Sequence, residues 1–216
     1  MQWTLVVPVK PLERAKSRLS DTAADAVRPG LALAFAQDTV TAALAATAVR
    51  DVVVVTDDPL AARELAALGA RTVPEGPRGG SRDGLNAALR HGTALVRDGR
   101  PQSPVAALNA DLPALRSEEL TRVLNAAAEF PRSFLPDAAG TGTTLLAATS
   151  GHDLSPVFGP DSRLRHRRSG AVELALATVD SVRQDVDTGD DLRAALGLGV
   201  GPRTAAAAAR LLIPGQ

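Results

Sequence analysis

The sequence lacks cysteine, has only 2% aromatic residues and carries no excess of either charge. Without cysteine it can form no disulfide, no thiolate metal site and no thiol nucleophile. Lysine plus arginine and aspartate plus glutamate each number 24, which removes the main electrostatic reason for general binding to nucleic acid or a membrane surface. No run approaches the roughly 20 apolar residues of a membrane span, and Trp3–Val9 is too short for a signal peptide. We therefore expect a soluble, cytoplasmic protein that contacts neither nucleic acid nor membrane.

The sequence does contain strand patterns that alternate with helix patterns. The run Asp51–Thr56 is almost entirely valine, and a strand that is apolar on both faces is typical of the centre of a parallel sheet. The expected strands are 4–9, 51–56, 71–73, 104–108, 132–136, 143–149 and 181–186. The expected helices are 30–46, 59–68, 84–96, 118–128, one from about 170, and 205–212. This order predicts an α/β fold with a mostly parallel sheet and helices on both faces.

Three cations follow the first expected strand: Lys10, Lys16 and Arg18. Ligands of an open parallel sheet bind beyond the carboxyl ends of its strands. Cations there can hold a polyphosphate and stabilise a departing pyrophosphate. The segment lacks the glycines of a Walker A loop, and a solvated surface loop is the alternative interpretation.

Aspartates follow two other expected strands. Asp111 comes after the strand 104–108, where a carboxylate can bind Mg²⁺ together with substrate phosphate oxygens; a turn or helix-capping aspartate is the alternative. Asp185 and Asp187 would lie on one side of the strand 181–186. We expect one of them to complete a metal site with Asp111 and the other, with Thr188, to cap the next helix.

Glycine-rich and basic segments provide two further candidates. The segment 140–144 is no dinucleotide fingerprint, since it lacks the third glycine and opens a strand, but its glycines would let the backbone approach an anion and Thr143 could donate a hydroxyl. The basic segment 163–168, which includes His166, is either a solvated face or an anion site.

Taken together, these segments resemble a known family, the phosphoenolpyruvate/2-phospho-L-lactate guanylyltransferases of coenzyme F-420 biosynthesis. The matching segments are Val9-Lys10, Ala15-Lys16-Ser17-Arg18-Leu19, Gly84-Leu85-Asn86, Asn109-Ala110-Asp111-Leu112-Pro113-Ala114-Leu115, Gly140-Thr141-Gly142-Thr143, Phe158-Gly159-Pro160-Asp161-Ser162, Arg165-His166 and Asp185-Val186-Asp187-Thr188. The resemblance covers nearly the whole chain. It implies one domain over residues 1–216 with a nucleotide-diphospho-sugar transferase-like fold and a mixed sheet.

The resemblance also implies an activity and a set of site residues. Members transfer GMP from GTP to the phosphate of a three-carbon acid and release pyrophosphate. The alanine- and arginine-rich composition suits an actinobacterium, so we expect phosphoenolpyruvate as the acceptor and enolpyruvoyl-2-diphospho-5'-guanosine as the product. The implied residues are Thr143, Gly159 and Ser162 for the acceptor, Asp111 and Asp185 for Mg²⁺, Lys10, Lys16, Arg18 and Asn86 for the nucleotide, and Lys16 and Arg18 for the leaving pyrophosphate.

Other interpretations remain open at this point. The acceptor could be 2-phospho-L-lactate or, on the same fold, a molybdopterin or sugar phosphate, although the missing glycine-rich first loop argues against the last two. A non-catalytic nucleotide-binding regulatory domain is a further alternative, but a receiver needs an acidic pocket after its first strand, where Lys10 stands. The sequence leaves the oligomeric state open, with a homodimer as one option.

Overall fold

The computed structural model describes residues 1–14, 27–76 and 84–210, so Lys16 and Arg18 lie outside the described residues. Its strands are β1 (Trp3–Pro8), β2 (Val49–Val55), β3 (Arg71–Val73), β4 (Val105–Leu108), β5 (Arg132–Pro136), β6 (Thr143–Ala148) and β7 (Val172–Glu173). Its helices are the 3₁₀ turn η1 (Leu12–Arg14), α1 (Arg28–Ala45), α2 (Pro59–Ala66), α3 (Gly84–Gly99), α4 (Ser117–Ala127), α5 (Ser162–Arg168), α6 (Asp180–Arg183), α7 (Gly189–Leu198) and α8 (Pro202–Ala209). In the described part of the chain, no helix combines the length and apolar character needed to cross a membrane.

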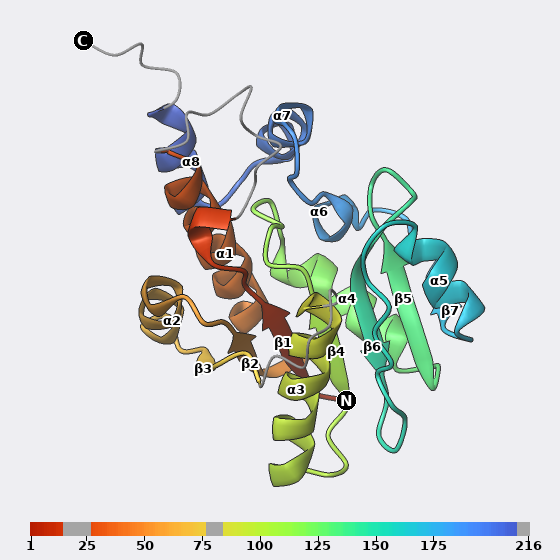
Figure 1. Cartoon of the computed structure of the whole chain (residues 1–216). Helices are drawn as coiled ribbons and strands as arrows, with labels where there is room; N and C mark the ends of the chain where they lie inside the picture. Colours follow the sequence, from red (N-terminus) through yellow and green to blue (C-terminus); the bar gives the residue numbers. More distant parts are fainter. Residues whose placement is uncertain (15–26, 77–83, 211–216) are drawn as a thin grey trace.

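All seven strands join one sheet in the order β3-β2-β1-β4-β6-β5-β7 (Figure 1). The pairs β1–β2, β1–β4, β2–β3 and β5–β7 are parallel, whereas β6 runs antiparallel to both of its neighbours. The chain leaves β1 toward β2 on one side and returns to β4 on the other. The strand order therefore reverses between β1 and β4, the position at which open α/β sheets bind ligands.

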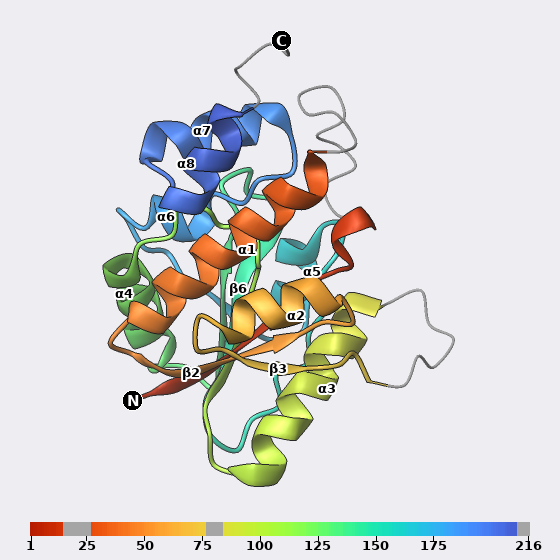
Figure 2. The same ribbon diagram turned by 90° about the vertical axis from the view of Figure 1, so that its left-hand side faces the viewer.

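Helices cover both faces of the sheet, as the sequence predicts. In β2, Val52 and Val54 join a core with residues of α1, α2 and α4, whereas Val53 and Val55 join a second core with residues of α3. These four valines are at most 1% exposed, because a central strand is covered on both sides. Helices α7 and α8 lie at one end of α1 (Figures 1 and 2), where Phe35, Leu192 and Ala195 form a third cluster.

Two of the elements predicted after residue 168 are wrong. Residues 181–186 do not form a strand: Asp180–Arg183 is the short helix α6, and Ser181 and Val182 are its buried residues. No helix starts near residue 170 either, because Gly170, with a φ of +84°, follows the end of α5. The segment beyond it forms β7, which pairs with β5. The helix lies earlier, in the basic segment that we left without a secondary structure.

His166 links α5 to the sheet from inside the second core. Its side chain is 0% exposed, its Nδ1 lies 2.9 Å from the Thr143 hydroxyl, and its Nε2 accepts a 3.1 Å hydrogen bond from the Val157 N–H. Burial, together with the positive charges of Arg132 and Arg165, lowers the pKa of His166 from 6.5 to about 4. The imidazole is therefore a neutral structural group at pH 7, and not the exposed ligand contact that its place in the basic segment suggests.

Because His166 is buried and neutral, we predict that the protein loses stability in acid. Between pH 6.5 and 4 the unfolded chain binds a proton at His166 that the folded chain does not, so the free energy of unfolding falls as the pH falls through that window. The full loss is about 3 kcal/mol for a shift of this size. Urea unfolding at several pH values should show a shallower acid dependence for His166→Phe than for wild type. His152→Phe, which changes an exposed histidine, should keep the wild-type slope; equal slopes in all three proteins would contradict the assignment.

Candidate functional site

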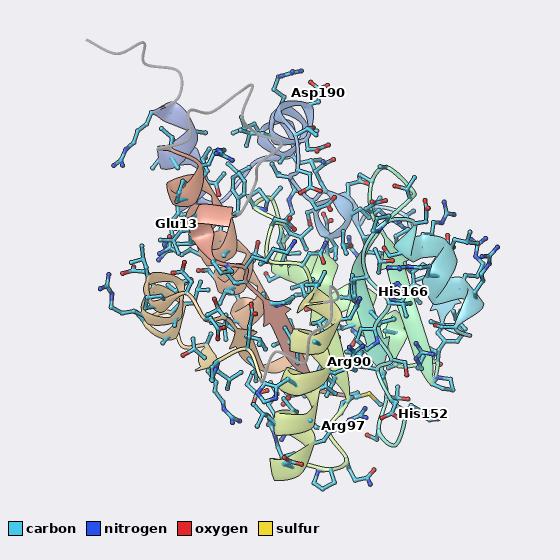
Figure 3. The ribbon with its side chains drawn as sticks, viewed as in Figure 1. Glu13, Arg90, Arg97, His152, His166 and Asp190 are labelled. Atoms are coloured by element: carbon cyan, nitrogen blue, oxygen red, sulfur yellow. The ribbon has the colours of Figure 1, made fainter. Side chains whose placement is uncertain are left out.

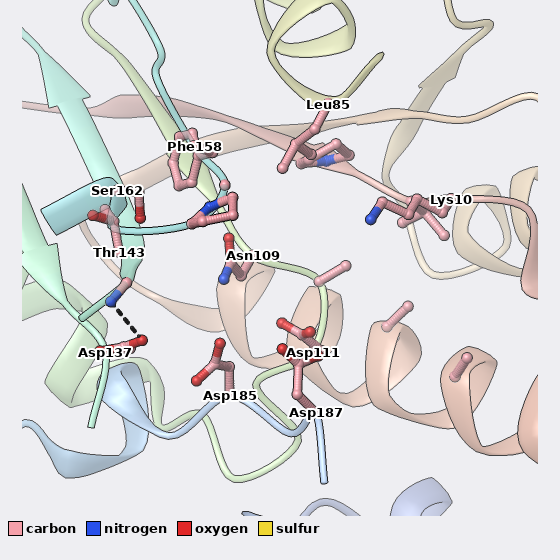
Figure 4. Close-up of a pocket in the computed structure, with 18 of the residues that line it drawn as sticks. Lys10, Leu85, Asn109, Asp111, Asp137, Thr143, Phe158, Ser162, Asp185 and Asp187 are labelled. Carbon is pink, nitrogen blue, oxygen red and sulfur yellow. Dashed lines mark hydrogen bonds between the residues drawn. The ribbon is translucent and has the colours of Figure 1, made fainter. Parts of the chain in front are cut away.

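A cavity of about 750 Å³ opens at the carboxyl edge of the parallel strands. Most of its lining comes from the segments that follow β1, β4 and β5, from the start of β6, and from the two segments 158–162 and 185–187, and helices α1 and α3 contribute the rest. Because β6 is antiparallel, its first residues reach the edge at which β4 ends: Leu108 pairs with Leu145, and the Asn109 N–H donates to the Thr144 carbonyl at 3.0 Å. Figure 4 shows this cavity with its polar side chains.

The floor of the cavity is acidic. Asp111, Asp185 and Asp187 all line it, and Figure 4 shows their carboxylates at the same part of the cavity. A 3.0 Å hydrogen bond from the Val186 N–H to the Asp111 carbonyl joins the two segments that carry them. The convergence that the sequence predicts for Asp111 and Asp185 therefore occurs, although no strand 181–186 produces it.

Contacts from two helices hold this floor in place. The Thr39 hydroxyl on α1 accepts from the Leu112 N–H at 3.0 Å, next to Asp111. Glu119 on α4 accepts from the N–H and the hydroxyl of Ser181 at 3.0 and 2.8 Å, which anchors α6 ahead of Asp185. Both acidic segments are thus fixed from the same face of the sheet.

The acids of the cavity would need further ligands to bind a metal ion. Within residues 1–14, 27–76 and 84–210, no three His, Cys, Asp or Glu side chains are grouped closely enough to hold a metal ion by themselves. Mg²⁺ commonly binds through one or two carboxylates and completes its six ligands with water and substrate phosphate. The carboxylates of Asp111 and Asp185 fit that donor set.

Asp187 does not cap the following helix, contrary to one of our two expectations for this aspartate. Thr188 is the N-cap of α7: its hydroxyl accepts from the Asp191 N–H, and the Asp191 carboxylate accepts from the Thr188 N–H, forming a capping box. A threonine hydroxyl serves this role without bringing a charge, which leaves the Asp187 side chain at the cavity wall.

Lys10 lines the cavity directly after β1, on the side away from Thr143 and Ser162 (Figure 4). The turn that follows it is held by Asp58, whose Oδ2 accepts from the Leu12 N–H at 2.9 Å while Oδ1 caps α2 through the N–H groups of Leu60 and Ala61. Burial raises the pKa of Asp58, but the three N–H donors outweigh it and the pKa is lowered overall. Asp58 thus starts a helix, as expected, and also shapes the loop that carries Lys10.

Thr143, Gly159 and Ser162, the three residues expected to bind the acceptor, all line the end of the cavity next to β6. Gly159 has a φ of +116°, and a Cβ there would lie 2.9 Å from Arg165 Nη2. The positive φ favours glycine at this position, since side-chain-bearing residues rarely adopt it. Thr143 and Ser162 are 4% and 2% exposed, so both residues are almost fully buried at this end of the cavity.

Asn86, expected to bind the nucleotide, contacts the protein itself. Its amide donates to the Phe158 carbonyl at 3.1 Å and accepts from the Phe158 N–H at 2.8 Å, and the side chain is 3% exposed. This pair of hydrogen bonds holds α3 against the segment that leads to Gly159. A substitution of Asn86 would therefore affect a bound ligand at least indirectly, by changing the shape of the cavity wall.

Sequence reasoning missed Asp137 as a lining residue. Its carboxylate accepts from the N–H groups of Thr141 and Gly142 at 2.9 and 2.8 Å, which closes the loop ahead of Thr143 (Figure 4). A Cβ on Gly142 would overlap that carboxylate, which explains the glycine. The signal was present: Asp137 directly follows a predicted strand, in the same way as Asp111.

Three arginines of the basic segment 163–168 contact other parts of the protein. Arg163 and Arg167 both contact Glu173 on β7, and Arg165 donates to the Phe158 carbonyl. A hydrogen bond from Arg163 lowers the pKa of Glu173 further than burial raises it. Glu173 thus holds two of these arginines, and Arg165 contacts the segment that leads to Gly159.

Two relatives of this chain are named for the same enzymatic activity. A protein of Streptomyces scabiei is 88% identical over the full length of both chains and is named phosphoenolpyruvate guanylyltransferase. A Streptomyces coelicolor protein of the same name is 74% identical, again over both full lengths.

Solved structures of low identity share the fold. A Desulfovibrio desulfuricans protein assigned to the nucleotide-diphospho-sugar transferases aligns with a TM-score of 0.66 at 16% identity, covering 98% of this chain and 99% of its own. A nucleotidyl transferase from Methanothermobacter thermautotroptrophicus gives 0.64 at 22%, covering 91% and 97%. Rv0371c of Mycobacterium tuberculosis, solved in complex with manganese, gives 0.52 at 20%, covering 91% and 99%. The predicted nucleotide-diphospho-sugar transferase-like fold is confirmed.

The model of one family matches residues 3–206, and its description is "Guanylyl transferase CofC like". That match spans every strand of the sheet and every segment that lines the cavity. The chain therefore belongs to the CofC-like guanylyl transferases.

Proposed function

We propose that this chain, acting as one domain, transfers GMP from GTP to the phosphate of phosphoenolpyruvate in coenzyme F-420 biosynthesis. A phosphate oxygen of the acid attacks the α-phosphorus, the bond from that phosphorus to the bridging oxygen breaks, and pyrophosphate leaves. The product is enolpyruvoyl-2-diphospho-5'-guanosine. The observation that carries the proposal is the meeting of Asp111 and Asp185 in one cavity with Thr143 and Ser162. The shared name of the full-length relatives supports the choice of donor and acceptor.

The order of the strands suggests how the substrates share the cavity. Lys10 follows β1, the acids follow β4, and Thr143 opens β6, and these strands are neighbours in that order. We assign the triphosphate to the side of β1 and the acid to the side of β6, with the reacting phosphates over Asp111 and Asp185. Each substrate then meets groups suited to it: a cation at the triphosphate, and hydroxyl and main-chain donors at the acid.

Asp111 and Asp185 would hold Mg²⁺, which when bound would offset the negative charge of the two reacting phosphates. The manganese complex of Rv0371c supports a divalent cation on this fold. The protein's own contribution is positioning, since the attacking phosphate is already anionic at neutral pH and needs no side-chain nucleophile. Lys10, Lys16 and Arg18 would bind the nucleotide phosphates, and Lys16 and Arg18 would stabilise the departing pyrophosphate.

The first test replaces one carboxylate. Asp111→Asn keeps the side-chain shape but removes the charge, so pyrophosphate release from GTP and phosphoenolpyruvate at saturating Mg²⁺ should fall by a factor on the order of 100 to 1,000. The control is Asp153→Asn, which changes a side chain that is 91% exposed and pairs with Arg97; it should keep wild-type turnover. Circular dichroism and thermal unfolding would verify that both variants fold. Wild-type kcat in Asp111→Asn would refute the metal assignment.

The second test separates the two substrates. Ser162→Ala should raise the KM for phosphoenolpyruvate by about tenfold, the cost of one lost hydrogen bond to a charged group, and leave the KM for GTP within about twofold. Ser150→Ala serves as the control, because Ser150 donates to the Gln102 carbonyl in a turn after β6, away from the cavity. An equal rise in both KM values would remove Ser162 from the acceptor site. Offering 2-phospho-L-lactate in the same assay would report which acid the enzyme prefers.

A further inference from the structure

His166 contacts Thr143 and the segment that leads to Gly159, without lining the cavity itself. Figure 3 shows it between α5 and the strands β5 and β6. Its two ring nitrogens reach Thr143 and the Val157 N–H. The ring of Phe158, the residue ahead of Gly159, meets the imidazole edge-on with 4.9 Å between the ring centroids. This histidine therefore links the start of β6 to the segment that ends at Ser162.

The contacts determine the position of the imidazole proton. The Val157 main-chain N–H can only donate, so Nε2 must accept and cannot carry a hydrogen. A neutral imidazole carries its single hydrogen on the other nitrogen, and Nδ1–H therefore donates to the Thr143 oxygen 2.9 Å away. The ring is buried and neutral at pH 7, so the doubly protonated form does not compete.

This tautomer sets the role of the Thr143 hydroxyl. One lone pair of its oxygen accepts from His166, and its own hydrogen is left to donate in another direction. Among the described residues, His166 is the hydrogen-bond partner of this hydroxyl, and Thr143 lines the cavity. The opposite tautomer would draw the hydroxyl hydrogen onto Nδ1 and present only oxygen lone pairs to the cavity. Phosphate and carboxylate oxygens accept hydrogen bonds and would be repelled by such a surface.

We propose that His166 is a positioning residue for the acceptor acid: as the Nδ1–H tautomer, it orients the Thr143 hydroxyl to donate into the cavity toward an anionic oxygen of the acid. Its Nε2 accepts from the Val157 N–H, and this contact selects the Nδ1–H tautomer. This inference rests on the proposed function for the identity of the anion, but the tautomer does not depend on it.

The first measurement reads the tautomer without turnover. In protein labelled with ¹⁵N in its histidines, long-range ¹H–¹⁵N NMR spectra at pH 7 distinguish a protonated from an unprotonated ring nitrogen. The His166 signals, assigned from their absence in His166→Phe, should show a protonated Nδ1 and an unprotonated Nε2. A protonated Nε2, alone or as imidazolium, would overturn the proposal. That result would leave the proposed guanylyl transfer untouched.

The second measurement separates the two nitrogens. In His166→Asn the amide can occupy the place of Nδ1 and still donate to Thr143, whereas in His166→Gln it can occupy the place of Nε2 and accept from Val157. The KM for phosphoenolpyruvate should therefore rise by about tenfold in His166→Gln and His166→Phe and by less than about threefold in His166→Asn. The KM for GTP should stay within about twofold in all three variants.

The control for these variants is His152→Phe, at the opposite end of the sheet (Figure 3), which should leave both KM values unchanged. A merely structural role for His166 would lower stability or active-enzyme concentration and affect both substrates alike. Equal KM values for the acid in His166→Asn and His166→Gln, or an equal rise for acid and GTP, would overturn the proposal. If the wild-type protein fails to release pyrophosphate, the proposed function fails, and the NMR spectrum still decides the orientation of Thr143.

Discussion

The direction of β6 is the constraint on which the site depends. An antiparallel strand between β4 and β5 starts where its neighbours end, so Thr143 lies beside Asn109 and the glycine-rich loop joins the carboxyl edge of β4. Had β6 run parallel, its first residues would lie at the far edge of the sheet, and the hydroxyl would be separated from the aspartates by the length of the strand. One reversed strand therefore brings donors for an anion next to carboxylates for a cation.

The aspartates of the cavity floor and the residues expected to bind the acceptor are held in place by different contacts. The acidic floor is held by hydrogen bonds from the Val186 N–H to the Asp111 carbonyl, from the Leu112 N–H to Thr39, and from Ser181 to the Glu119 carboxylate. On the acceptor side, the arginines behind the wall are paired with Glu173 or with carbonyls. Thr143, Gly159 and Ser162 line the cavity on this side, together with Asp137 and Asp161.

Periodicity predicted most of the sheet and its helices because burial on both faces leaves a strong pattern. The valine run at β2 is one example, and the helix after Asp58 is another, since a capping aspartate and a proline mark its start. The pattern misled beyond residue 168. Ser181–Val186 reads as a strand from its residue types alone, but Glu119 binds the first turn of a helix there, and such a contact from 62 residues away leaves no local signal.

The sequence by itself determined the fold class, the family resemblance and the aspartates that follow strands, because the residues at strand ends and the hydrophobic period are local properties of the chain. Only the tertiary structure decided that Asp187 faces the cavity while Thr188 caps α7, that Asn86 binds the Phe158 backbone, and that His166 is buried and neutral. Each of these outcomes depends on a contact with a residue distant in the chain, or on which of two neighbouring residues caps a helix. Hydrogen bonds are short and directional, so the partner of a polar side chain is decided only when the packing brings the candidate groups together.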